Sequence, residues 1–276
     1  MRFALFSPKG SIIEMTAAPL VEERIVCRQT TLTVLTDCAA PRTGNADRLI
    51  LLILHGALRS GRDFLPSLAP YRTWADLLIP DLPGNGASEF PLEAGIGALA
   101  DEIASLVRRR VPGRRVILVG ESLGGLVALR CCDGRLPAAA IVLLDPPLSM
   151  AKQWVVQFNA AETCKRTQHW YHRTIAQDVF GLDPDSGYVQ ERLYYGDLAA
   201  LAAPCLIISG DTPLFPVWHT ALVPNCFDEV DELIVRSLKP SCRIERLSEC
   251  GHRVFLDGGE RCHNLIRRFV CDALNV

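Results

Sequence analysis

The sequence predicts an α/β protein of three layers, in which helices cover both faces of a mostly parallel sheet of about eight strands. Two observations lead to this class. Short, continuously apolar runs recur along the 276 residues, and such runs are typical of strands that are buried on both faces. Stretches of helical length separate the runs, and strands that alternate with helices form parallel βαβ units.

The individual elements follow from the same patterns, in chain order. Residues 23–36 alternate between apolar and polar side chains, which predicts two short strands at an edge of the sheet. Buried strands are predicted at 48–56, 75–81, 115–120, 139–145, 204–211 and 242–248. Helices are predicted at 97–110, 123–133, 223–238 and 259–273.

One interval interrupts this alternation of strands and helices. Residues 146–203 contain no run typical of a buried strand, but they contain helix-like stretches with several tryptophans and tyrosines. Such a length is far beyond that of an ordinary connection between a helix and a strand. We therefore expect a helical cap at 146–203, inserted after the sixth strand, with residues 1–145 and 204–276 forming the core domain.

Composition limits the classes of function. A formal net charge of −2 and the lack of a long basic stripe argue against nucleic-acid binding. The eleven cysteines form no C-x-x-C pairs, which favours reduced thiols in a cytoplasmic protein over a disulfide framework or a structural zinc site. The N-terminal residues lack the pattern of a signal peptide, and no apolar run reaches the roughly 18 residues that a membrane span needs. We expect a cytoplasmic protein without a membrane span or a bound metal.

The stretch Gly120-Glu121-Ser122-Leu123-Gly124 carries the first sign of chemistry, because it joins a predicted buried strand to a predicted helix. It matches the G-x-S-x-G pattern of a nucleophile elbow, in which a sharp turn lifts the serine hydroxyl clear of its own backbone. Glycines on both sides let neighbouring backbone approach without a Cβ clash. Ser122 is therefore the predicted nucleophile, and the alternative is a structural serine in a tight turn.

With this motif the sequence resembles the α/β-hydrolase family, over roughly residues 25–273. Three further segments carry the resemblance: LHGALRSGRDF (54–64) is similar to the oxyanion loop, IPDLPGNGASE (79–89) to the stretch after the fourth strand, and ECGHRVFLD (249–257) to the loop that presents the catalytic histidine. The resemblance implies the three-layer α/β-hydrolase fold. It also implies His252 as the general base and an oxyanion hole made by the backbone N–H groups of Ala57 and Leu123.

The acid that orients the histidine is open between two aspartates. The family most often places it after the seventh strand, in a G-x-x-D turn, where this chain has Asp211 directly after Gly210 and a proline, Pro213, at the usual position of the acid. That turn is therefore shortened. A less common arrangement places the acid after the sixth strand, where Asp145 stands. We take Asp211 as the first candidate and Asp145 as the alternative.

A serine nucleophile in this family implies an acyl-enzyme and no cofactor. We expect a serine hydrolase that cleaves a carboxylic ester of a small-molecule substrate with an apolar or ring-bearing acyl group. A thioesterase or acyltransferase that acts on carrier- or CoA-bound acyl groups would use the same residues, with a carrier protein as a partner. From another class, a non-catalytic ligand-binding protein can share the fold, but such proteins usually lack the serine or the histidine.

Overall fold

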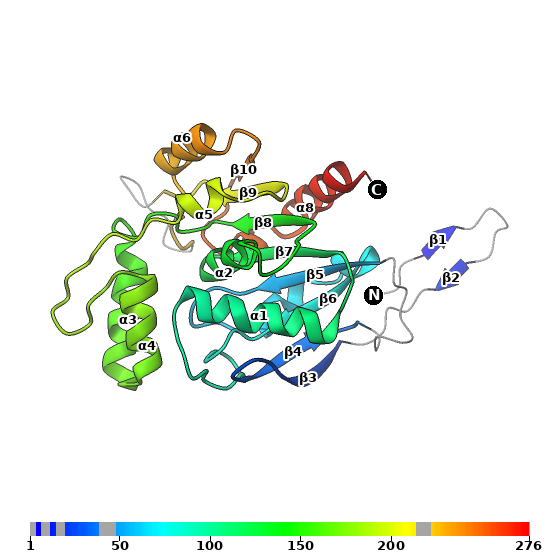
Figure 1. Cartoon of the computed structure of the whole chain (residues 1–276). Coiled ribbons are helices and arrows are strands. Elements are labelled where there is room, and N and C mark those ends of the chain that lie inside the picture. The colour runs from blue at the N-terminus through cyan, green and yellow to red at the C-terminus, as the bar shows by residue number, and fades with distance from the viewer. Residues whose placement is uncertain (1–3, 7–11, 15–19, 39–47, 214–221, 276) are drawn as a thin grey trace.

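The computed structural model describes residues 4–6, 12–14, 20–38, 48–213 and 222–275 (Figure 1). In this part of the chain, eight strands form one sheet in the order β10-β9-β8-β7-β5-β6-β4-β3. Their bounds are β3 (Val21–Val26), β4 (Thr31–Thr36), β5 (Leu49–Leu54), β6 (Ala75–Pro80), β7 (Val116–Glu121), β8 (Ala140–Leu144), β9 (Cys205–Gly210) and β10 (Arg243–Leu247). In this order, all neighbouring strands from β10 across to β6 pair in parallel, β5 included. β4 pairs antiparallel with both β3 and β6. β1 (Ala4–Phe6) and β2 (Ile12–Glu14) form a separate antiparallel pair.

Helices cover both faces of this sheet (Figure 1). The central strand β5 shows why, since its successive side chains point to opposite faces and are all buried. Leu52 and Leu54 pack in one apolar cluster with α1 (Ile96–Arg110) and α2 (Leu123–Cys131). Leu51 and Ile53 pack in a second cluster with α8 (Gly259–Leu274). The predicted three-layer architecture with about eight strands is therefore confirmed.

The predicted helix at 223–238 is wrong in its first turns, because α6 spans only Glu229–Leu238. The Asp228 carboxylate accepts hydrogen bonds from the backbone N–H groups of Val230 and Asp231, both at 3.0 Å, and so caps the helix at this point. The residues before it form a loop. This loop packs against Asp145 and His252.

The interval 146–203, all of which is described, holds helices and only isolated β-bridges. Its elements are α3 (Trp154–Thr167), α4 (Trp170–Thr174), a π-helical turn (Ile175–Val179) and α5 (Tyr195–Ala199). Figure 1 shows α3 and α4 beyond the edge at which the parallel strands end. The Tyr171 hydroxyl donates to the Pro83 carbonyl at 2.5 Å and ties α4 to the loop after β6. That 146–203 forms a separate cap domain stays a prediction.

The remaining elements are short helices in the connections: 3₁₀ helices at Gly61–Ser67 and Tyr71–Thr73, and α7 (Val254–Asp257). Among the described residues, none of the helices is both long enough and apolar enough to cross a bilayer.

Candidate active site

Ser122 lies in the sharp turn between β7 and α2. Its backbone has φ 55° and ψ −119°, a conformation that residues with a side chain rarely adopt. A Cβ on Gly120 would lie 2.3 Å from the Gly124 carbonyl oxygen, and a Cβ on Gly124 would lie 2.2 Å from that of Leu54. Only glycine fits at either position, because backbone meets backbone there. The turn therefore has the geometry of a nucleophile elbow.

We predict that Gly124→Ala destabilises the fold by about 3 kcal/mol, because the new methyl group overlaps backbone atoms that have no room to move. Urea unfolding followed by circular dichroism measures the change. Gly196→Ala in α5 is the matched control, since no heavy atom lies within 4 Å of a Cβ built there. We expect the control to keep or slightly raise stability, and equal stabilities for the two variants would contradict the close approach at Gly124.

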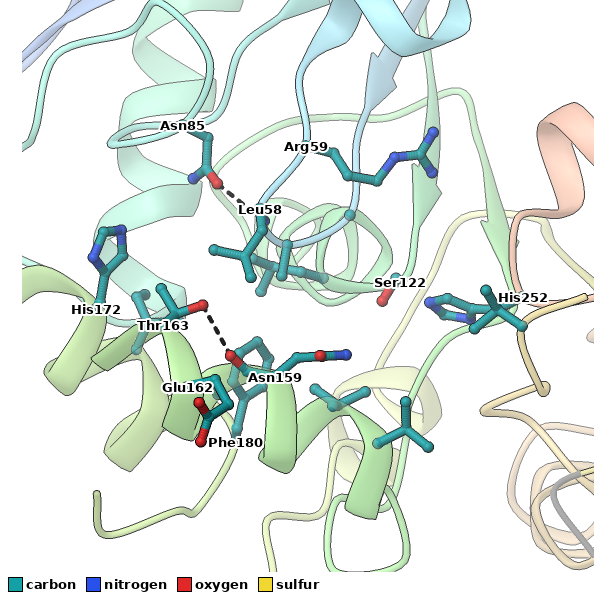
Figure 2. A pocket seen from close by; sticks show the side chains of 18 of the residues that line it. Leu58, Arg59, Asn85, Ser122, Asn159, Glu162, Thr163, His172, Phe180 and His252 are labelled. Atoms are coloured by element: carbon teal, nitrogen blue, oxygen red, sulfur yellow. Dashed lines mark hydrogen bonds between the residues drawn. The ribbon is translucent and has the colours of Figure 1, made fainter. Parts of the chain in front are cut away.

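A cavity of about 440 Å³ lies beside Ser122, a volume within the range of small-molecule sites. Figure 2 shows the Ser122 hydroxyl and the His252 ring pointing toward one another at one end of this cavity, and His172 and Asn85 at the other end. Much of the lining is apolar, with Leu58, Val155, Val156, Ala160, Ile175, Phe180 and Val223. The cavity could therefore hold an apolar group directly against the serine.

His252 is held at the cavity by its backbone and by its ring. Its N–H donates to the Val223 carbonyl at 2.8 Å, and its Nδ1 lies 2.5 Å from Oδ2 of Asp145. The Asp145 side chain is fully buried and the His252 side chain is 17% exposed. Since Nδ1 faces the carboxylate, Nε2 is the nitrogen left to meet a hydroxyl.

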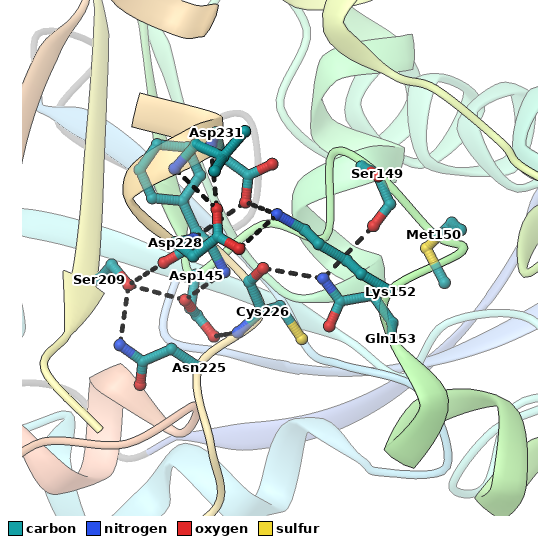
Figure 3. A network of polar contacts seen from close by, with 12 residues as sticks. Asp145, Ser149, Met150, Lys152, Gln153, Ser209, Asn225, Cys226, Asp228 and Asp231 are labelled. Atoms are coloured by element: carbon teal, nitrogen blue, oxygen red, sulfur yellow. Dashed lines mark hydrogen bonds and ion pairs between the residues drawn. The ribbon is translucent and has the colours of Figure 1, made fainter. Parts of the chain in front are cut away.

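Asp145 follows β8 with a positive φ of 46°, and its carboxylate is fully engaged. Oδ2 accepts from the Cys226 N–H at 2.7 Å, and Oδ1 accepts from the Phe227 N–H at 3.0 Å and the Ser209 hydroxyl at 2.8 Å. Figure 3 shows the contacts of the carboxylate with Ser209 and Cys226. Several donors that point at one carboxylate fix its orientation toward the histidine.

The protonation of His252 depends on opposing effects. Burial by itself lowers the pKa of the imidazole, whereas Cys226 and Asp145 beside it raise that pKa, and the net result lies well above the ordinary value. We attribute the rise to Asp145, because burial also raises the pKa of the Cys226 thiol and keeps it uncharged at neutral pH. A carboxylate that stabilises the imidazolium is what a histidine base requires.

The other candidate acid, Asp211, bonds to the backbone of Cys250. Its side chain is exposed just after β9. Its N–H donates to the Cys250 carbonyl at 3.0 Å, and its carboxylate accepts from the Cys250 N–H at 3.3 Å. Asp211 therefore ties the turn after β9 to the chain just before His252, and of the two aspartates Asp145 is the one that contacts the ring.

Ala57 and Leu123 both line the cavity next to Ser122. Leu123 is the first residue of α2, where an N–H group has no partner within the helix. Neither N–H group has a hydrogen-bond partner among the residues that the structure describes. His55 shapes the loop that carries Ala57, because its Nε2 accepts from the Leu82 N–H at 2.9 Å while its Nδ1 lies 2.7 Å from the Gly56 carbonyl oxygen.

Sequence reasoning missed the ion pair next to the serine. The Glu121 side chain is almost fully buried and pairs with Arg59, from the loop after β5. Burial raises the pKa of Glu121, and the Arg59 charge opposes that rise. A carboxylate inside the apolar run VILVGESLGGL was the available signal. Cys226, which faces Asp145 and His252, could not be predicted as part of the site, because its segment was predicted to be helical.

Comparisons with known proteins identify the family of the chain. A sequence profile described as the alpha/beta hydrolase family matches residues 51–264. The 2-succinyl-6-hydroxy-2,4-cyclohexadiene-1-carboxylate synthase of Pectobacterium atrosepticum is 30% identical over 144 residues, which cover 47% of this chain and 56% of that protein. Lipase LipV of Mycobacterium tuberculosis is 31% identical over 118 residues, which cover 42% of this chain and 44% of the lipase. The chain thus spans about half the length of the curated relatives it matches.

Solved structures share the fold over almost the whole chain. A thermophilic esterase from Thermogutta terrifontis superposes with a TM-score of 0.66, covering 92% of this chain and 99% of the esterase. Its sequence identity of 17% makes this a likeness of fold alone. The family profile, by contrast, covers most of the sequence itself. The chain therefore belongs to the alpha/beta hydrolase family.

Proposed function

We propose that the protein is a serine hydrolase that cleaves a carboxylic ester, with Ser122 as nucleophile, His252 as general base and Asp145 as the orienting acid. The observation that carries this proposal is that the Asp145 carboxylate holds Nδ1 of His252, while the His252 ring faces the Ser122 hydroxyl at one end of the cavity (Figure 2). A buried acid, a histidine and a serine in this order are the parts of an acyl-transfer site.

In the first half of the reaction, Oγ of Ser122 attacks the ester carbonyl carbon while Nε2 of His252 takes the hydroxyl proton. Asp145 keeps the remaining ring proton on Nδ1 and stabilises the imidazolium. The negative charge on the carbonyl oxygen faces the free N–H groups of Ala57 and Leu123, which need no reorganisation to receive it. His252 then gives its proton to the departing alcohol, which leaves the acyl group on Ser122.

In the second half, water attacks the acyl-enzyme and His252 takes the water proton. The same N–H groups receive the second oxyanion, and the collapse of this intermediate returns the proton to Ser122 and releases the carboxylic acid. The reaction consumes one water and needs no redox partner or cofactor.

The cavity favours an apolar or ring-bearing acyl group. Its apolar lining comes largely from α3 and the π-helical turn, so we propose that residues 146–203 act as the cap that selects the substrate. The two curated relatives are named for a lipase and for a synthase of a cyclohexadiene carboxylate, and both names fit an apolar or cyclic substrate. We also propose a cytoplasmic location, because all eleven cysteines are free thiols, as a reducing compartment maintains them.

Labelling with a fluorophosphonate tests the proposal directly. We expect the wild-type chain to take up one label, on the peptide that contains Ser122, as measured by mass spectrometry. His252→Ala should slow the labelling at least about 100-fold, because the hydroxyl loses its base. Equal labelling rates in the two proteins, or a label on another residue, would refute the proposed mechanism. A panel of p-nitrophenyl esters and acyl thioesters then distinguishes ester from thioester preference.

A further inference from the structure

Asp145, Cys226 and His252 come from three distant segments, and together they place a cysteine next to the proposed catalytic acid and base. A carboxylate oxygen, the cysteine sulfur and a ring nitrogen all lie within 4.8 Å of one another. Asp145 and Cys226 are buried, and His252 is partly exposed at the cavity. Among the described residues, this is the one group of three His, Cys, Asp or Glu side chains whose ligand atoms lie close enough together to hold a metal ion.

A second cavity, of about 30 Å³, adjoins two of these three residues. It is lined by both Cys226 and His252, and it shares Val155, Val156 and Val223 with the larger cavity. The space exceeds the roughly 10–15 Å³ that one water molecule needs. A small ion therefore has room beside Cys226 and His252, in a cavity that shares lining residues with the substrate cavity.

We propose that Asp145, Cys226 and His252 form a binding site for a soft divalent cation such as Zn²⁺, which switches the proposed hydrolase off. Thiolate, imidazole and carboxylate are the ligands that Zn²⁺ takes in proteins, and three such ligands plus one open position are a common arrangement. Bond lengths of about 2.0–2.3 Å in a tetrahedral site place ligand atoms about 3.3–3.8 Å apart. To reach this spacing, the 2.5 Å distance between Oδ2 of Asp145 and Nδ1 of His252 would lengthen by about 0.8 Å. Two ligand atoms as far apart as 4.8 Å, the upper limit of the separations within the group, would approach by about 1 Å.

The surroundings hold two of the three ligands in place. The Asp145 carboxylate is oriented by the N–H groups of Cys226 and Phe227, and the Cys226 carbonyl accepts from Nε2 of Gln153 at 2.8 Å. Figure 3 shows Cys226 and the Asp145 carboxylate side by side in this network. Partners that orient the ligands of a metal usually strengthen its binding.

Metal binding and catalysis exclude one another for a chemical reason. Binding replaces the Cys226 thiol proton, which leaves to solvent. A neutral imidazole has a single lone pair, and the metal uses it whichever ring nitrogen it takes. His252 then has no lone pair with which to accept the Ser122 proton, so the metal-bound chain cannot activate its nucleophile. Chelation by EDTA restores the base.

Metal binding by the full chain tests this inference without any use of activity. We expect calorimetry to show one Zn²⁺ per EDTA-treated wild-type chain, and Co²⁺ to give a thiolate-to-metal charge-transfer band. Cys226→Ala should abolish the band and weaken Zn²⁺ binding at least about 10-fold. Cys38→Ala is the matched control, because Cys38 is as buried as Cys226, at 5% exposure for each, and stands apart from the three ligands. Unchanged Zn²⁺ affinity in Cys226→Ala, or bound Co²⁺ without the band, would overturn the inference.

The switch itself rests on the proposed function and is measured by ester hydrolysis, with each variant normalised to its own metal-free rate. Zn²⁺ should inhibit the wild type at the concentration at which it binds, and Cys226→Ala should require at least about 10-fold more. If Cys226→Ala unfolds at a lower temperature than the wild type, Cys226→Ser replaces it in this measurement, because serine keeps the size of the side chain. A wild type that binds Zn²⁺ but hydrolyses no ester refutes the proposed function alone. One that hydrolyses esters and binds no Zn²⁺ refutes this inference alone.

Discussion

Ser122→Ala is expected to lower kcat/KM for an activated ester by about 10⁴- to 10⁶-fold, because the acyl-enzyme can no longer form. Any remaining rate would come from the oxyanion N–H groups and the cavity, which the substitution leaves in place. Initial rates with p-nitrophenyl butyrate measure the loss. Ser248→Ala is the control, since Ser248 is exposed and its hydroxyl only accepts from Arg261 at 3.2 Å; it should keep wild-type activity.

The loss in Ser122→Ala should not come from unfolding. Alanine has the same Cβ as serine, so the positive φ at this position and the close glycine contacts remain as they are. We expect the two proteins to unfold at the same temperature within a few degrees. A Ser122→Ala variant that stays folded and retains more than about 1% of the activity would exclude this serine as the nucleophile.

Asp145→Asn is expected to lower kcat by about 10⁴-fold, because an amide cannot hold His252 in the right tautomer or stabilise its charged form. The N–H groups of Cys226 and Phe227 now donate to the carboxylate. In the asparagine variant, the NH₂ group of the amide would face one of these donors and could not accept from it. Asp211→Asn is the matched control in the turn after the neighbouring strand. It should change kcat by less than about threefold, since its carboxylate bonds to the Cys250 N–H and not to the ring.

The pH dependence separates a role in catalysis from a role in folding. His252 acts as a base only when it is neutral, so wild-type kcat/KM should fall as the pH drops through the raised pKa of His252. Removing the Asp145 charge lowers that pKa, so the residual activity of Asp145→Asn should persist to lower pH. A pH profile that shifts in Asp211→Asn and stays in place in Asp145→Asn would assign the acid to Asp211.

The parts of the fold that the sequence predicted well depend on local patterns. Apolar runs such as 48–56 and 115–120 correspond to β5 and β7, within two residues at each end. The nucleophile elbow was predictable because the backbone of its tight turn requires glycines within two residues of the serine. The start of α6 was missed, although Asp228 with Asp231 three residues later is a capping signal that the sequence contains.

The choice of acid needed the structure. Asp145 and Asp211 follow the neighbouring parallel strands β8 and β9, so strand prediction places both at the same edge of the sheet. The loop before α6 decides between them, because it points the N–H groups of Cys226 and Phe227 at Asp145. The proposed metal site could not be inferred from spacing along the chain for a similar reason, because its three candidate ligands lie far apart in sequence.

By itself, the amino-acid sequence determined the layered α/β class, the order of strands and helices, the serine on its glycine-flanked turn and the histidine after the last strand. Each of these depends on side-chain periodicity or on backbone conformation within a few residues. Only the tertiary structure decided that Asp145 meets His252, that Glu121 pairs with Arg59 and that Cys226 adjoins the imidazole. These contacts depend on how separate loops pack at the carboxyl edge of the sheet, and local sequence patterns do not contain that information.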